Sequence, residues 1–212
     1  MSQADLFGSA LLTLGEGACL LPGFAGAEGE ALVSSIHDLI RQAPLRHMET
    51  PGGFRMSVAM SNCGQAGWIT DTRGYRYGGL DPLNQQPWPD MPPLFMELAR
   101  RAAAAAGYPG FQPDACLINR YEPGARMSLH QDRNERDFSQ PIVSVSLGLP
   151  ATFLFGGLRR SDRPRRLPLQ HGDVVVWGGP TRLAFHGVAP LAAGEHALCG
   201  AFRFNLTFRK AL

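Results

Sequence analysis

Five short runs of β-branched and aromatic residues fill the C-terminal half of the chain, and they constrain the fold more than any other feature. Glycine and proline separate the runs, and no helical pattern lies between them. The runs are ACLINRY (115–121), IVSVSLGL (142–149), ATFLF (151–155), DVVVW (173–177) and HALCGAFRFNLTFR (196–209). Several short strands joined by turns, without intervening helices, favour an antiparallel sandwich or barrel.

Two segments outside these runs have the pattern of helices. Residues 27–42 repeat apolar side chains at positions that share one helix face. That face consists of Leu32, Val33, Ile36, Leu39 and Ile40. Residues 94–106 follow Pro92-Pro93 and end before Gly107, which is the punctuation typical of a helix. We therefore predict a mostly β, α+β fold in which two helices pack against the outside of the strands.

The last run alternates between two kinds of side chain. Because side chains alternate along a strand, one face is apolar and the other is polar. The apolar face holds Phe202, Phe204, Leu206 and Phe208, and the polar face holds Arg203, Asn205, Thr207 and Arg209. If the apolar face packs against the helices, both arginines point into the interior. A buried arginine is costly without a partner, so the pattern predicts an anion inside the barrel.

The composition is that of one folded domain. The chain has 212 residues, of which 44% are hydrophobic and 18% are charged, and its net charge is +2. Disordered chains are poorer in apolar residues and higher in net charge, and a domain of this length buries a sizeable core. We therefore expect a single domain over residues 1–212, monomeric by default, and the near-neutral charge indicates no particular partner.

Cysteine usage and the N-terminal segment bear on location. The four cysteines are widely separated and form no CxxC pair, so we expect reduced thiols. No Lys or Arg precedes Arg41, so the Leu6–Leu21 stretch lacks the basic start of a secretory signal. No window approaches the ~20 apolar residues of a membrane span. We predict a cytoplasmic protein with no membrane association and no obligatory protein partner.

A His-x-Asp/Glu motif with a distant second histidine is the sequence sign of an Fe(II) site built from two histidines and one carboxylate. Three of the six histidines begin such a motif: His47-Met48-Glu49, His130-Gln131-Asp132 and His171-Gly172-Asp173. Three matches make the motif alone a weak signal. The first precedes a Thr-Pro-Gly-Gly turn and fits a solvated loop. The third has the glycine of a tight turn in which the aspartate caps the backbone.

The spacing to the next histidine favours the second motif. His186 follows Asp132 by 54 positions, which leaves room for four or five strands that return the chain beside the pair. It follows Asp173 by only 13 positions, about the length of one hairpin. We therefore predict that His130, Asp132 and His186 hold a metal ion, with Arg203 on a strand nearby.

Several segments together resemble the AlkB family of Fe(II)/2-oxoglutarate-dependent repair dioxygenases. They are LINRYEPGARMSLHQD (117–132), PIVSVSLGLPATFLFGGLRR (141–160), HGDVVVWGG (171–179), RFNLTFR (203–209), TPGGFRMSVAMSNCG (50–64) and GWITDTRGYRY (67–77). The resemblance runs from about residue 20 to the C-terminus. It implies a double-stranded β-helix (jelly-roll) core over residues 113–212. It also implies a nucleotide-recognition lid over about residues 46–90, called the lid segment below.

The resemblance also assigns roles to individual residues. The metal ligands and catalytic centre would be His130, Asp132 and His186, holding Fe(II). Groups that anchor the cosubstrate 2-oxoglutarate would be Asn119, Tyr121, Arg203, Asn205 and Arg209. Groups that contact the nucleotide would be Trp68, which stacks on a flipped base, with Tyr75, Tyr77, Asn134, Arg160 and Thr50.

The activity implied by the resemblance is oxidative removal of N-methyl groups from alkylated bases such as 1-methyladenine and 3-methylcytosine. The partner would be alkylated single-stranded DNA or RNA, and the products formaldehyde, succinate and CO2. Two positions depart from the family pattern: Asn134 stands where the family has an acid, and Phe54 where it has tyrosine. An uncharged Asn134 predicts weaker discrimination between cationic and neutral methylated bases.

Two alternatives remain open from the sequence. One keeps Fe(II) and 2-oxoglutarate but acts on a protein or a small molecule. The other is a cupin-like nucleic-acid-binding module without redox chemistry, which leaves Arg203 and Arg209 without a carboxylate partner. Succinate production from 2-oxoglutarate excludes the second alternative, and turnover of a methylated oligonucleotide excludes the first.

Overall fold

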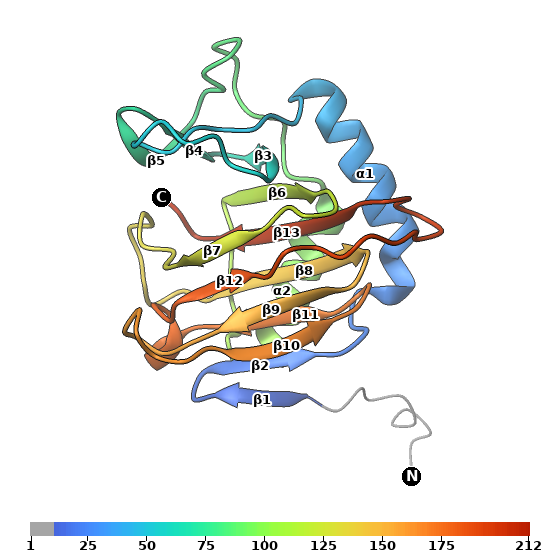
Figure 1. Cartoon of the computed structure of the whole chain (residues 1–212), viewed down its shortest axis with the longest axis vertical. Helices are drawn as coiled ribbons and strands as arrows, with labels where there is room; N and C mark the ends of the chain where they lie inside the picture. The colour runs from blue at the N-terminus through green and yellow to red at the C-terminus, as the bar shows by residue number, and fades with distance from the viewer. Residues whose placement is uncertain (1–10) are drawn as a thin grey trace.

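Two antiparallel sheets face each other in the computed structural model, which describes residues 11–212 (Figure 1). The first ten residues of the predicted domain, including the start of the Leu6–Leu21 stretch, lie outside the described residues. The large sheet has the order β1 (Leu12–Gly15), β2 (Ala18–Leu21), β11 (Val174–Trp177), β8 (Ile142–Gly148), β13 (Arg203–Arg209), β6 (Ala115–Tyr121) and β3 (Ala59–Gly64). The small sheet has the order β10 (Arg165–Leu169), β9 (Ala151–Phe155), β12 (His186–Val188) and β7 (Met127–His130).

Apolar side chains from both sheets fill the space between them. Val175 and Trp177 of the large sheet pack in one cluster with Phe153, Phe155 and Val188 of the small sheet. This packing of two antiparallel sheets is the double-stranded β-helix, or jelly roll, that the resemblance implied. The fold class predicted from the sequence is therefore confirmed.

Two helices cover the outer face of the large sheet (Figure 1). They are α1 (Gly29–Gln42), which follows the 3-10 turn η1 (Gly26–Glu28), and α2 (Pro93–Ala105). Their buried residues pack against Phe204, Leu206 and Phe208 of β13, which places the polar face of β13 toward the interior. The alternating pattern of residues 203–209 thus predicted which way the strand faces.

The strand predictions were correct in type but not in every boundary. Four of the five predicted runs contain β6, β8, β9 and β11, whereas the expected strand over 196–209 is wrong for its first half. Residues 196–200 form a turn closed by backbone hydrogen bonds between His196 and Gly200, at 2.9 and 2.7 Å. Gly200 has φ 58°, and this left-handed conformation ends the extended chain. The short strands β1, β2, β7, β10 and β12 are missing from the prediction.

The lid segment begins at the edge of the large sheet. It contains β3, the hairpin of β4 (Gly67–Asp71) and β5 (Gly74–Gly78), and the loop that follows (Figure 1). Arg46 and Asp81 form a partly buried ion pair at 2.7 Å, and the Arg46 guanidinium lies over the Trp88 ring at 5.1 Å. The role of this segment as a lid stays a prediction. No helix among residues 11–212 is long and apolar enough to cross a membrane.

Candidate metal centre and substrate groove

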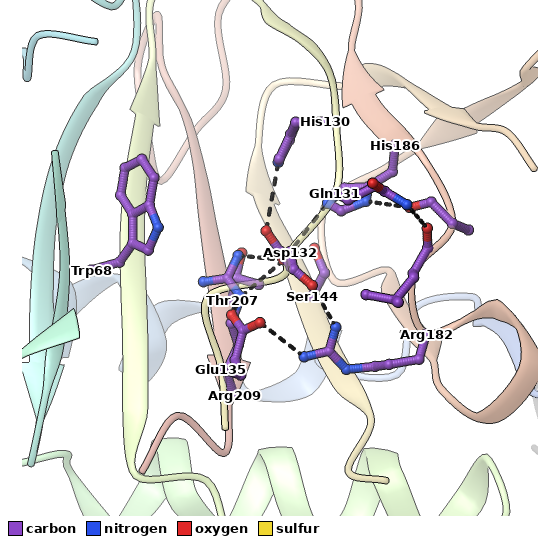
Figure 2. Close-up of polar contacts among 12 residues, drawn as sticks. Trp68, His130, Gln131, Asp132, Glu135, Ser144, Arg182, His186, Thr207 and Arg209 are labelled. Carbon is purple, nitrogen blue, oxygen red and sulfur yellow. Dashed lines mark hydrogen bonds and ion pairs between the residues drawn. The ribbon is translucent and has the colours of Figure 1, made fainter. Parts of the chain in front are cut away.

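His130, Asp132 and His186 come together at the open end of the small sheet (Figure 2). His130 ends β7 and His186 begins β12, and the two residues are paired directly across these strands. The two carboxylate oxygens of Asp132 each lie 3.7 Å from the Nε2 atom of one histidine. Among the described residues, this is the one group of three ligating side chains, with its atoms within 4.8 Å of one another.

Hydrogen bonds orient both imidazoles for coordination. Nδ1 of His130 lies 2.8 Å from the Ser128 carbonyl, and Nδ1 of His186 lies 3.0 Å from the Ala184 carbonyl. A carbonyl only accepts, so each Nδ1 carries a proton, and each Nε2 atom faces Asp132. Burial, followed by the nearby His130, lowers the pKa of His186 to about 3, so His186 is neutral and able to bind a metal.

The Asp132 carboxylate contacts an arginine as well as the two histidines. Oδ2 accepts hydrogen bonds from Nη2 and Nε of Arg209, at 2.6 and 2.9 Å. Burial opposes ionisation of Asp132, but Arg209 and then the two histidines outweigh it and hold its pKa below the usual range. Oδ1 faces His130 and leaves a carboxylate ligand free, which completes the two-histidine, one-carboxylate donor set typical of Fe(II).

A small cavity behind these residues contains unsatisfied hydrogen-bond donors. Arg203 is 1% exposed, and its Nη2 donates to the Ser146 hydroxyl at 2.9 Å. Its Nε and Nη1 find no partner in the described part of the chain, and neither does Oδ1 of Asn119. Arg203 and Asn119 both line the cavity, and the two free donors of Arg203 would be satisfied by an anion bound there. A carboxylate fits an arginine fork well, so these residues fit 2-oxoglutarate.

The other predicted cosubstrate residues have partners within the chain. The Tyr121 ring lies under the Arg203 guanidinium at 4.9 Å. Asn205 lines the cavity, but its amide group donates to the Ser144 hydroxyl at 2.8 Å and the Val145 carbonyl at 3.0 Å. Arg209 also lines the cavity, although it is already paired with Asp132. Of the two arginines predicted to bind the cosubstrate, Arg203 is therefore the one with free donors.

A larger groove of about 1000 Å³ opens beside the metal site and is shared with the lid segment. Five of the six predicted nucleotide contacts line it: Thr50, Trp68, Tyr75, Asn134 and Arg160. The Trp68 and Tyr75 rings stack at 5.6 Å, and Trp68 Nε1 donates to the Asn134 side chain at 3.4 Å. Arg160 donates to the Leu129 carbonyl at 2.8 Å, next to His130. Aromatic rings and a metal ligand thus line the same groove.

Tyr77 is the exception. Its hydroxyl donates to the Glu135 carboxylate at 2.7 Å and does not line the groove, so its contact with nucleotide stays a prediction. Sequence reasoning missed Glu135 and Arg182, which form a buried ion pair at 3.1 Å beside the metal site. The only signal for Glu135 was a carboxylate three residues after Asp132, and Arg182 gave none.

Comparison with known proteins identifies the family. A sequence profile of the 2OG-Fe(II) oxygenase superfamily matches residues 17–209. This chain belongs to that superfamily. The oxygenase is also 59% identical over 198 residues to "Alpha-ketoglutarate-dependent dioxygenase AlkB" of Escherichia coli (strain K12), which covers 93% of this chain and 92% of that protein.

Two further similarities involve ALKBH1 proteins. "DNA N(6)-methyladenine demethylase ALKBH1C" of Arabidopsis thaliana is 34% identical over 169 residues, covering 68% of this oxygenase and 37% of that protein. The solved structure titled "The structure of OsALKBH1" has a TM-score of 0.85 at 28% identity, and covers 95% of this oxygenase and all of that chain. The oxygenase is therefore an enzyme that uses Fe(II) and 2-oxoglutarate with O2, as the sequence predicted.

Proposed function

We propose that this oxygenase removes N-methyl groups from alkylated bases in DNA and RNA, with 1-methyladenine and 3-methylcytosine as substrates. One observation carries the proposal: the metal site opens into a groove that combines stacked aromatic rings with exposed arginines. Its rim carries Arg55, Arg126, Arg133 and Arg160, all exposed, while Asp132 is the one carboxylate among the described lining residues. Aromatic faces suit bases and arginines suit phosphates.

The position of the methyl group on the base determines which nucleic acid can be a substrate. The target methyl group lies on the pairing edge of the base, so the nucleotide has to be unpaired or flipped out. Trp68, which stacks on Tyr75, offers a ring on which the base stacks in the same groove that His130 lines. Stacking of this kind contributes on the order of 1–3 kcal/mol per base. We therefore expect a preference for single-stranded nucleic acid.

The residues of the chain divide the chemical work. His130, Asp132 and His186 would hold Fe(II), and Arg203 would bind a carboxylate of 2-oxoglutarate through its free donors. Bound Fe(II) and 2-oxoglutarate supply, with O2, hydroxylation of the methyl group and the coproducts succinate and CO2. The hydroxylated methyl group leaves the base nitrogen as formaldehyde. Phe153 and Trp177 line the inner cavity and keep that side apolar.

A monomeric state and a cytoplasmic location are further parts of the proposal. The four cysteines, which all lie in the described part of the chain, are free and buried. Free thiols fit a reducing compartment.

Formaldehyde release from a 1-methyladenine oligonucleotide tests the proposal directly. The parent protein with Fe(II), 2-oxoglutarate and air should release formaldehyde in proportion to repaired base, and His130→Ala should release none. Arg166→Ala, at an exposed position on β10 outside the groove lining, is the matched control and should keep full activity. Succinate production without formaldehyde from any methylated oligonucleotide would favour a protein or small-molecule substrate instead.

A further inference from the structure

Arg182 connects two parts of the chain that carry different metal ligands. It directly follows the 3-10 turn η2 (Gly179–Thr181), and its side chain is 3% exposed. Its guanidinium donates to the loop between β7 and β8, residues 131–141, called the metal loop below. Nη1 donates to the Asp132 carbonyl at 2.9 Å, Nη2 to the Glu135 carboxylate at 3.1 Å, and Nε to the Gln140 carbonyl at 2.9 Å.

We infer that Arg182 is a positioning residue of the metal centre, because its guanidinium holds the metal loop in the shape that presents Asp132 beside the two histidines. The metal loop contains no helix or strand, so individual side-chain contacts determine its shape. The three acceptors span nine residues of this loop, and the planar fork reaches all of them at once. Figure 2 shows Arg182 next to Glu135 and close to Asp132.

A second contact strengthens the same connection. The Gln131 side chain, one residue before Asp132, donates to the Leu183 carbonyl at 2.6 Å. Residues 182 and 183 therefore contact the metal loop from one side, and the chain reaches His186 three residues later. These contacts fix the distance between the part of the chain that carries Asp132 and the part that carries His186.

The surroundings of Arg182 exclude water. The Phe138 ring of the metal loop covers the guanidinium at 5.3 Å, and Glu135 is 6% exposed. Lysine keeps the positive charge in this place but offers one ammonium group, which cannot span the three acceptors. Substitution by lysine therefore separates the geometric role of Arg182 from its charge.

The test measures binding of Mn(II) alone to the metal-free protein by isothermal titration. Groups that orient metal ligands typically change metal affinity by ~10–100-fold when replaced. We expect Arg182→Lys to bind Mn(II) about 10-fold more weakly than the parent, and Arg182→Met at least as weakly. The inference rests on the metal centre of the proposed function, but this readout needs no oligonucleotide. If the parent protein binds Mn(II) but releases no formaldehyde, the proposed function is wrong. The comparison of Mn(II) affinities still tests the role of Arg182.

Arg46→Lys is the matched control. Arg46 is also a largely covered arginine that is paired with a buried carboxylate, Asp81, and lies over an aromatic ring, Trp88, but it stands at the start of the lid segment. Its replacement should lower the melting temperature without changing Mn(II) affinity. If Arg182 contributed to folding alone, Arg182→Lys would likewise lower the melting temperature and leave the Mn(II) affinity unchanged.

Parent-like Mn(II) affinity in folded Arg182→Lys would therefore overturn the inference. If the Arg182 variants fail to fold by near-ultraviolet circular dichroism, Phe138→Leu takes their place. It exposes the guanidinium to water without removing a charge, and we expect a several-fold loss of Mn(II) affinity. Unchanged affinity in Phe138→Leu would then count against the inference.

Discussion

The hydroxyl of Tyr77 lies 2.7 Å from Oε1 of Glu135, and this contact joins the lid segment to the metal loop. The same oxygen lies 3.5 Å from Nε of Arg209, which in turn is paired with Asp132. Burial raises the pKa of Tyr77 well above its ordinary value, so the hydroxyl keeps its proton and remains a donor. Two residues, Glu135 and Arg209, thus connect the lid segment to the predicted metal ligand Asp132.

Removal of that hydroxyl should loosen the lid segment. A hydrogen bond to a charged group contributes about 1.5–3 kcal/mol, so Tyr77→Phe should lower the free energy of unfolding by about that amount. Amide exchange over residues 67–78 should also become faster. Urea unfolding and hydrogen exchange measure the two effects. Tyr75→Phe is the control, because no hydrogen bond of its hydroxyl occurs within residues 11–212, and an equal loss in both variants would contradict the assignment.

The free donors of Arg203 predict a specific defect in cosubstrate use. Arg203→Lys keeps the charge but loses the fork, so one of two parallel hydrogen bonds to a carboxylate disappears. We expect the KM for 2-oxoglutarate to rise about 10-fold or more, while the KM for oligonucleotide stays within about 2-fold. Steady-state kinetics with each substrate varied in turn separates the two constants. An unchanged KM for 2-oxoglutarate would show that Arg203 does not bind it.

Asn134 predicts how strongly the groove discriminates between lesions. The Asn134 side chain accepts from Trp68 at 3.4 Å and donates to the Tyr75 carbonyl at 3.5 Å, so it lies at the aromatic wall without a charge. An acid there favours a cationic base, since charge-assisted hydrogen bonds are about twice as strong as neutral ones. Asn134→Asp should raise the ratio of kcat/KM for 3-methylcytosine over 3-methylthymine by about 5-fold. A ratio equal to that of the parent would contradict this role.

The sequence was sufficient where a pattern is repeated along one element. Strand β13 alternates over seven residues, and this pattern, together with helices expected on the outside, predicted that Arg203 and Arg209 face the interior. The spacing of His130, Asp132 and His186 predicted a group that the structure brings together. The identities of individual contacts, such as the stacking of Trp68, came from the family resemblance rather than from a pattern.

Other features left no pattern to read. Strands β7 and β12 have four and three residues, too few for alternation to show, although each carries a metal-site histidine. Arg182 and Glu135 act on each other across 47 positions of sequence, and neither lies in a motif. Their pairing depends on how the metal loop folds back on residues 179–183, which is a tertiary contact. Sequence reasoning from one chain therefore finds ligands more easily than the groups that position them.

The buried thiols predict a loss of stability at high pH. Burial raises the pKa of the Cys199 thiol to about 11, so the folded state favours the neutral thiol. The contribution of Cys199 to stability is fully present below the ordinary thiol pKa of about 8.5 and is lost between that pH and about 11. Urea unfolding from pH 7 to 10 should therefore show a smaller decline in Cys199→Ala than in the parent. Equal slopes would mean that this thiol does not contribute.

Gly187 allows β7, which carries His130, and β12, which carries His186, to approach each other closely. A Cβ atom at this position would lie 2.6 Å from the Met127 carbonyl oxygen and 3.2 Å from the Leu129 nitrogen. Both are backbone atoms of β7. Backbone cannot move aside as a side-chain end can, so Gly187→Ala should push β12, with His186, away from β7, with His130. Overpacking of this kind costs about 1–3 kcal/mol.

We expect Gly187→Ala to lower the free energy of unfolding by that amount and also to weaken Mn(II) binding, because the two histidines separate. Gly78→Ala is the control, since its Cβ would meet only the Ile69 side-chain end at 3.4 Å and a carbonyl at 3.9 Å. It should change stability by less than about 0.5 kcal/mol and leave Mn(II) affinity as in the parent. If Gly187→Ala loses stability but keeps its Mn(II) affinity, the strands adjust without moving the ligands, and the close approach at Gly187 does not set the separation of His130 and His186.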